Sequence, residues 1–221
     1  MSLDPTIKTE LNRRLEMYEG RVPHLYLDSL GKVTIAIGHQ VSSRQATSGL
    51  TLYTSVAGIP GRPATLPEKQ AEYDSILKRT KGLRAAGYKP HTTLLMKDWD
   101  INQLRDQHIS DFHRELGNIY KKTRGYQADF DQLPPKVQLA LFDMIFNLGA
   151  SKLVSVFVNF DKAIKAGDWK TAAAQSNRPQ CKRIGTTTLR PYFSTQLAES
   201  RRQAERSRER PLVSNRACLI I

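Results

Sequence analysis

The most hydrophobic part of the chain runs from Pro135 to Leu148, with the sequence PKVQLALFDMIFNL. Apolar residues occupy nearly every side of this stretch when it is drawn as a helix, so little polar face remains for solvent. Gly149 follows directly, and glycine is the residue type that most often ends a helix. The sequence therefore predicts a fully buried central helix that other elements must surround.

Further helical patterns lie on both sides of this stretch. From Lys97 onward, apolar residues keep the helical period over about six turns. Two more helices are predicted near 151–166 and 168–175, separated by Gly167 and Asp168 as stop and N-cap. Beyond them we expect a loop at 176–196, a basic helix at about 197–209 and a tail at 211–221. Residues 93–210 are thus expected to form a helical lobe.

Within the first 40 residues the spacing of apolar residues changes from that of a helix to that of β-strands. Apolar residues spaced four and three apart predict a helix that starts at Asp4–Pro5 and ends at Gly20. Residues 25–27 and 33–37 alternate as strands do, and 28–31 form a turn between them. This small lobe, combined with the helical one, predicts an α+β fold that is mainly α.

Residues 41–92 differ from both lobes because they are rich in Ser, Thr, Gly and Pro. The run GIPGRP at 58–63 predicts a loop. Thr65 and Glu68 form a capping-box pattern before a helix that should reach about Arg79, with Gly82 as its stop. The region has few apolar residues, so we interpret it as an insertion or flexible flap within one domain of residues 1–221.

Composition limits the class of function. The formal net charge of +13 favours an anionic partner: nucleic acid, anionic lipid or the acidic bacterial cell wall. No nucleic-acid motif accompanies the basic residues, and ESRRQAERSRER at 199–210 mixes both signs like a solvated helix face. We expect no metal or cofactor, because the five histidines lack ligand spacing. Cys181 and Cys218 can pair, but two reduced thiols are the favoured state.

Targeting signals are not recognisable in this sequence. No apolar run approaches the roughly 20 residues that span a bilayer, so no membrane insertion is expected. The N-terminal residues lack the basic and apolar regions of a signal peptide. We expect a monomer made in the cytoplasm.

Three polar residues of the small lobe could cleave a glycosidic bond, which needs a proton donor and a second group that handles water. Glu19 ends the first helix, where the helix dipole disfavours an ionised carboxylate, Asp28 starts the turn, and Thr34 lies in the second strand. Each also has an ordinary interpretation: a surface carboxylate, a turn-forming aspartate and a strand threonine. The residues alone leave both interpretations open.

The run YEGRVPHLYLDSLGKVTIAIGH at 18–39 resembles the N-terminal signature of phage-type lysozymes, the endolysin family. That signature has Glu-Gly, Tyr-x-Asp, Gly and then Thr-Ile-Gly-Ile-Gly-His. The intervals from Glu19 to Asp28 to Thr34 agree with the family's catalytic triad without a gap. The resemblance covers 5–40 strongly, 94–175 moderately and 197–206 weakly, and it implies a hairpin lobe hinged to a helical lobe.

The resemblance implies a role for each matching residue of the small lobe. Glu19 would be the general acid, while Asp28 would activate the attacking water and stabilise the developing positive charge. Thr34 would help to hold that water, and His39 would be structural, supporting the hairpin through hydrogen bonds. Inverting chemistry of this kind needs the two carboxyl groups roughly 6.5–9.5 Å apart.

The resemblance extends to the helical lobe. ALFDMIFNLGA at 140–150 resembles the family's buried helix, with Phe146 and Asn147 near the cleft, and Asn159 resembles the start of its next helix. LAESRRQAE at 197–205 is similar to an endolysin stretch whose first arginine, here Arg201, would pair with the catalytic glutamate. Lys182–Arg183 is a rival match for that arginine.

The sequence departs from the family pattern in three places. Ala36 stands where glycine is common, so its methyl group is expected to alter hairpin packing. The region 41–92 is longer than usual, and the extra basic residues near the C-terminus have no clear counterpart.

The leading hypothesis is a bacteriolytic muramidase whose partner is peptidoglycan. It would reach the wall as an endolysin through holin release, or as a secreted antibacterial effector, which would also have an acidic immunity protein as partner. A catalytically silent wall-binding or structural module of the same fold is the alternative. A nucleic-acid-binding protein is favoured by charge alone. Hydrolysis and lytic transglycosylation are not distinguished by the sequence.

Overall fold

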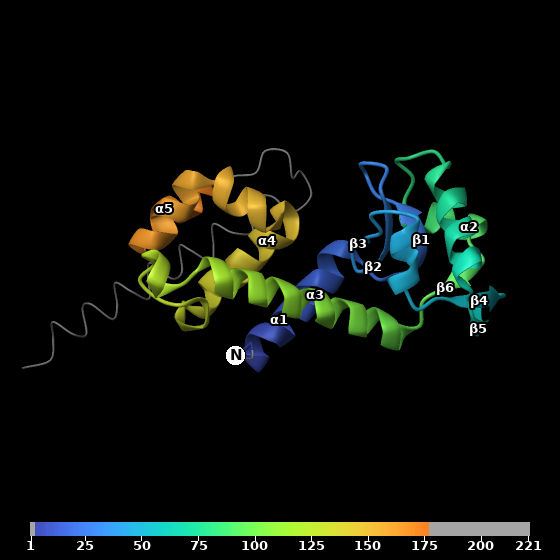
Figure 1. Ribbon diagram of the computed structural model, residues 1–221, viewed down its shortest axis with the longest axis horizontal. Helices are drawn as coiled ribbons and strands as arrows, with labels where there is room; N and C mark the ends of the chain where they lie inside the picture. Colours follow the sequence, from blue (N-terminus) through green and yellow to red (C-terminus); the bar gives the residue numbers. More distant parts are fainter. Residues whose placement is uncertain (1–2, 177–221) are drawn as a thin grey trace, which may run out of the picture. The chain divides into compact units, whose positions relative to one another are not determined.

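The computed structural model describes residues 3–176 (Figure 1). This part of the chain is mainly helical and has small antiparallel sheets, so the predicted α+β, mainly α class is confirmed. The chain divides into two compact units, residues 1–111 and 112–221. The boundary lies inside helix α3 (Asp98–Ile119) and not near residue 92, because Ile101 of α3 belongs to the core of the first unit.

Helix α1 (Pro5–Glu19) begins and ends where the sequence predicts. The Asp4 side chain accepts hydrogen bonds from the backbone N–H groups of Thr6 and Ile7, which the first turn of a helix cannot satisfy internally. At the other end Gly20 has φ +74° and ψ 178°, a conformation open essentially to glycine alone. The helix therefore ends at Glu19, three residues before the first strand begins at Val22.

The first sheet has the strand order β1-β2-β3, from β1 (Val22–Leu27), β2 (Val33–Ala36) and β3 (His39–Gln40). The predicted hairpin is confirmed, although β1 begins before residue 25 and β3 was not predicted. Strand β2 ends one residue early because Ala36 is left-handed, with φ +60°. An alanine in this conformation has steric strain that a glycine would not have.

The second sheet has the order β5-β4-β6, from β4 (Tyr53–Val56), β5 (Ile59–Pro63) and β6 (Leu94–Leu95). The prediction of a loop at 58–63 is therefore wrong. Two prolines are tolerated in β5 because it is the outer strand and exposed along its whole length, where a missing N–H costs no ladder bond.

Helix α2 (Leu66–Leu77) starts at the predicted capping box. Thr65 N–H donates to Glu68 Oε2 at 2.8 Å, and Glu68 N–H donates back to Thr65 Oγ1 at 3.5 Å. The helix ends at Leu77, two residues before the predicted end at Arg79. The short 3₁₀ helices η1 (Gln45–Gly49) and η2 (Ala85–His91) lie on either side of it.

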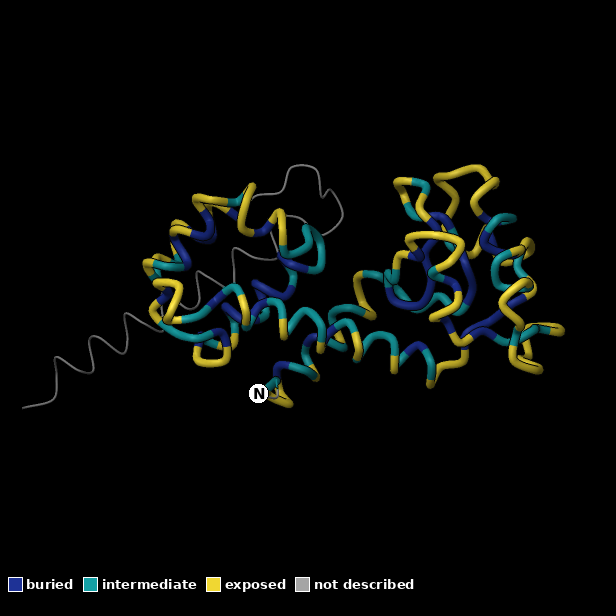
Figure 2. Tube along the Cα trace, in the orientation of Figure 1, coloured by how far each residue is buried: buried dark blue, intermediate teal, exposed yellow. Residues whose placement is uncertain are grey.

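Residues 41–92 are part of the first unit's core, so the interpretation of this region as a flap is wrong. Figure 2 shows buried segments in the first sheet, in β6 and in α2. The insertion gives this core six buried side chains: Val41, Leu50, Leu52, Tyr73, Ile76 and Tyr88. Glu72 also joins α2 to β6, because its Oε2 accepts the backbone N–H groups of Thr93 and Leu94 at 2.6 and 2.9 Å. The apolar residues of this region are widely spaced in the sequence, so no periodic pattern indicates that they form a core.

The second unit contains the end of α3, η3 (Lys122–Arg124), η4 (Phe130–Gln132), α4 (Pro135–Ser155), α5 (Val158–Ala166) and α6 (Trp169–Gln175). Gly149 interrupts α4 with φ +74° and ψ 158°, so the predicted helix end is confirmed. The single helix predicted for 151–166 is wrong, because residues to Ser155 continue from the kink and α5 begins at Val158. Gly167 and Asp168 separate α5 from α6 as predicted.

Among the described residues, α4 is the one helix long and apolar enough to cross a membrane by length and composition. Its buried residues, such as Leu141, Met144 and Ile145, have no exposed surface. The kink at Gly149 divides it. These features are those of a core helix, but the prediction that it is fully buried is wrong, because Leu139 and Phe146 are partly exposed. The predicted basic helix, the tail, Cys181 and Cys218 all lie outside the described residues.

Candidate functional site

Glu19 is the last residue of α1, and its carboxyl group lies against the turn between β2 and β3. The turn contains Gly38, with φ +69°. A Cβ atom placed on Gly38 would be 3.1 Å from Glu19 Oε2 and 3.4 Å from its Cδ. The helix end and the hairpin therefore meet at this carboxyl group, and a glycine provides the space for it. The Glu19 side chain is half-buried.

Asp28 closes the turn between β1 and β2. Its Oδ1 accepts the backbone N–H groups of Leu30 and Lys32, each at 2.8 Å, and its own N–H donates to Lys32 O at 2.9 Å. This is the local bonding of a turn-forming aspartate. Oδ2 accepts no hydrogen bond from the residues that the structure describes. One carboxylate oxygen therefore fixes the side chain, and the other can accept a bond from a bound molecule.

Thr34 lies on the same face of the hairpin as Asp28. Thr34 pairs with Tyr26 across the strands, and Asp28 follows Tyr26 by two residues with the hairpin bonding intact. Side chains in such positions project from one face, because the strand period is two. Thr34 is buried, and its hydroxyl donates to Lys32 O at 3.0 Å. The hydroxyl oxygen retains its capacity to accept a hydrogen bond.

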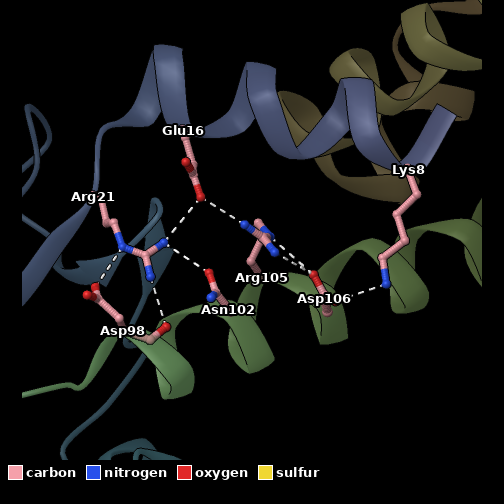
Figure 3. A network of polar contacts seen from close by, with 7 residues as sticks. All are labelled: Lys8, Glu16, Arg21, Asp98, Asn102, Arg105 and Asp106. Carbon is pink, nitrogen blue, oxygen red and sulfur yellow. Dashed lines mark hydrogen bonds and ion pairs between the residues drawn. The ribbon is translucent and has the colours of Figure 1, made fainter. Parts of the chain in front are cut away.

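A polar network holds the end of α1 on α3 (Figure 3). Arg21 donates to Asp98 Oδ1 at 2.9 Å, to Asn102 Oδ1 at 3.0 Å and to Glu16 Oε1 at 3.2 Å. The partly buried Arg105 donates to the same Glu16 oxygen at 2.8 Å. Glu16 is one helical turn before Glu19, and Arg21 is two residues after it. The network thus restrains the backbone on both sides of the candidate acid.

The same network continues along α1. Lys8 and Asp106 are 2.9 Å apart, and Asp106 also bonds to Arg105. Burial opposes ionisation of Asp106, but its bonds to Lys8 and Arg105 outweigh burial and lower its pKa. Ion pairs at such partly exposed positions each contribute little, but together they fix geometry. Sequence reasoning missed this network, since no local pattern relates residues of α1 to residues of α3.

His39, for which the resemblance implies a structural role, makes a bond that connects the hairpin to another element. Its Nδ1 lies 2.8 Å from Nε2 of His108 on α3, so one imidazole donates to the other, and the ring centroids are 4.7 Å apart. The pair joins β3, next to Gly38, to the long helix. His108 was not predicted, although a signal existed: it continues the spacing of the core residues Ile101 and Leu104 along α3 and so must face inward.

The histidine pair predicts acid sensitivity. Burial, reinforced by the facing His108, lowers the pKa of His39 to about 4, whereas an unfolded chain binds this proton near pH 6.5. Burial also lowers the pKa of His108, against the opposing effect of Asp111. Between about pH 4 and 6.5 the unfolded state therefore binds more protons than the folded state. Stability is complete above about pH 6.5 and falls as the pH drops toward 4, by about 2 kcal/mol after discounting for partial exposure.

Urea unfolding followed by circular dichroism at pH 7.5, 6, 5 and 4.5 measures this loss. The control is His39→Gln, which removes one titrating ring and should flatten the pH dependence while lowering stability at pH 7.5. An equal pH dependence in the variant and the wild type would show that the pair does not carry the effect.

The candidate residues of the helical lobe lie in the second unit. Phe146 of α4 packs edge-on against Phe112, with centroids 6.0 Å apart. Asn147 donates to the backbone oxygen of Asp143 at 2.8 Å, within its own helix. Asn159 is exposed in the first turn of α5. Arg201 and the rival Lys182–Arg183 lie outside the described residues.

A scan against protein-family models finds no matching family, and no curated protein matches the chain. Within residues 3–176, His, Cys, Asp and Glu side chains form no cluster of three that could hold a metal ion. Glu19 at the end of α1, and Asp28 and Thr34 in the first hairpin, all lie in the first unit.

Proposed function

We propose that this chain is a muramidase, a lysozyme-like glycoside hydrolase that cleaves the β-1,4 bond between N-acetylmuramic acid and N-acetylglucosamine in peptidoglycan. The observation that supports this most is the position of the Glu19 carboxyl group, at a helix end and against the glycine turn of the hairpin. The motif at 18–39 that resembles endolysins spans these elements. An acid, a second carboxylate and a hydroxyl from one short segment are what the reaction needs.

Glu19 acts in this proposal as the general acid. Its proton passes to the glycosidic oxygen as the bond from that oxygen to the anomeric carbon breaks. The Gly20 cap and the Arg21–Glu16 network keep the end of α1 in place. A fixed side chain contributes to the rate because a displacement of about 1 Å at such a group can cost about 10²-fold.

Asp28 acts on the other side of the reaction. Two backbone N–H groups hold its Oδ1, which leaves Oδ2 to accept a proton from the water that attacks the anomeric carbon. The negative charge also stabilises the oxocarbenium character of the transition state. The Thr34 hydroxyl donates to Lys32 O, so its oxygen accepts a bond from that same water.

The charge of the protein fits this substrate, because a net charge of +13 draws the enzyme to an anionic cell wall. As an endolysin it would be released through holin pores, and as an effector it would be exported by a secretion system and restrained by an acidic immunity protein. The proposed substrate is the same in both settings.

Release of new reducing ends from purified, insoluble peptidoglycan tests the proposal. We expect the wild-type protein to release them in proportion to time and enzyme concentration, and to clear the suspension. Suspensions that stay turbid, with no new reducing ends at any pH between 4 and 8, would contradict it.

The second candidate function is a wall-binding module without activity. It is favoured by the bonds of Asp28 and Thr34 to backbone groups of their own turn, which a purely structural hairpin would also make. Sedimentation of the protein with peptidoglycan, without release of reducing ends, would support this candidate over the muramidase.

A further inference from the structure

The cations of the insertion are concentrated in residues 78–89, which we call the cationic segment. It contains five cations, Lys78, Arg79, Lys81, Arg84 and Lys89, all exposed. The insertion's carboxylates do not offset them. Asp74 is paired with Arg44 and Glu68 with Arg62, and Glu72 is buried against β6. Within the described structure none of the five cations forms an ion pair. This segment therefore carries unneutralised positive charge.

The cationic segment is held in place by buried contacts. Tyr88 is fully buried, and its hydroxyl donates to Thr80 O at 2.8 Å, which ties the two ends of the segment together. His24 of β1 bonds Ala85 O through its Nε2 at 3.0 Å. The backbone that carries the five cations is thus held against the first sheet. Binding a partner therefore costs little conformational entropy of this backbone.

The segment lies beside the Asp28 turn. The Lys81 side chain passes Gly31, the residue that ends this turn, with its Cδ 3.4 Å from the position a Cβ of Gly31 would take. Gly31 N–H in turn donates to Asp28 O at 3.0 Å. The positive charge therefore begins at the edge of the proposed catalytic hairpin, where it would meet groups carried by a bound glycan strand.

We propose that the cationic segment is a substrate subsite that binds carboxylates of the acidic peptides attached to the glycan strand. This inference rests on the proposed function. Closely spaced exposed cations on a fixed loop suit carboxylates that project from a polymer, with a salt-dependent affinity. A single-stranded nucleic acid would need exposed aromatic side chains for its bases, and the one aromatic residue of the segment, Tyr88, is buried.

The test is the triple variant Lys78→Glu, Lys81→Glu and Arg84→Glu. Its matched control reverses three exposed lysines of the second unit, Lys152, Lys162 and Lys170, and so has the same net charge. KM and kcat are measured on solubilised peptidoglycan and on the same glycan strands after an amidase has removed their peptides. Circular dichroism verifies that both variants are folded.

We expect KM of the segment variant to rise about 10-fold on intact peptidoglycan at low ionic strength, and this rise to shrink in about 0.5 M salt. Its kcat should not change, its KM on peptide-free strands should equal that of the wild type, and the control should show neither effect. Equal KM values for the segment variant and the control would overturn the proposal. So would an equal rise on peptide-free strands.

Sedimentation with insoluble peptidoglycan separates this inference from the proposed function. If the wild type cleaves neither substrate, the muramidase proposal fails, and loss of sedimentation in the segment variant alone would still support the subsite. Walls stripped of phosphate polymers by hydrogen fluoride provide the last comparison. If only unstripped walls retain the wild-type protein, the segment recognises phosphate and the carboxylate subsite is wrong.

Discussion

Glu19→Gln is expected to lower the rate of peptidoglycan cleavage by at least about 10³-fold, because glutamine cannot supply the proton that the leaving oxygen needs. Glutamine has the same shape, and the side chain is half-buried, so the free energy of unfolding should change by less than about 1 kcal/mol. The measurement is the initial rate of reducing-end release, with thermal unfolding of the same preparation.

Glu10→Gln is the matched control on the same helix. Glu10 pairs with Arg13 and Arg14 on α1, well before the helix end. This variant should keep the wild-type rate. Comparable rates for Glu19→Gln and the wild type would remove Glu19 from the mechanism, whereas a variant that is inactive because it is unfolded would be recognised from its melting curve.

Gly38→Ala is expected to reduce both stability and activity. Alanine at φ +69° costs about 1–2 kcal/mol of strain. The new methyl group would also lie 3.1 Å from Glu19 Oε2 and 3.3 Å from its Cγ, so the carboxyl group must move. Since misplacing a catalytic group by about 1 Å costs about 10²-fold, kcat should fall by about 10- to 100-fold. Steady-state kinetics and urea unfolding measure the two effects.

Gly58→Ala is the control for Gly38→Ala. It separates the effect of backbone strain from the effect of displacing the Glu19 carboxyl group. Gly58 has φ +82°, and a Cβ there would meet nothing within 4 Å. We expect a comparable loss of stability with kcat unchanged. If Gly38→Ala retains the wild-type kcat, the Glu19 carboxyl group does not need the position in which the structure shows it.

Elements whose ends have local signals could be predicted from the sequence. Asp4, Pro5 and Gly20 mark α1, and the Thr65–Glu68 capping box marks the start of α2, because the bonds involved join residues close in the chain. The strands β4, β5 and β6 could not be predicted. They depend on pairing between distant residues, such as Tyr53 with Leu95.

The same distinction between local signals and contacts of distant residues applies to the candidate site. The spacing of Glu19, Asp28 and Thr34 can be recognised because all three lie in one short segment, and the resemblance to endolysins implies a role for each. The contacts that hold the site join distant residues: His39 with His108, and Arg21 with Asp98. Such partners follow from the fold and not from a local pattern.

The most direct test of the central claim is mass spectrometry of the products formed from defined peptidoglycan in water enriched in ¹⁸O. If Glu19 donates the proton and Asp28 directs a water molecule to the anomeric carbon, each new end is a reducing N-acetylmuramic acid that carries the label. Anhydro ends without the label, or the absence of new ends, would contradict the claim.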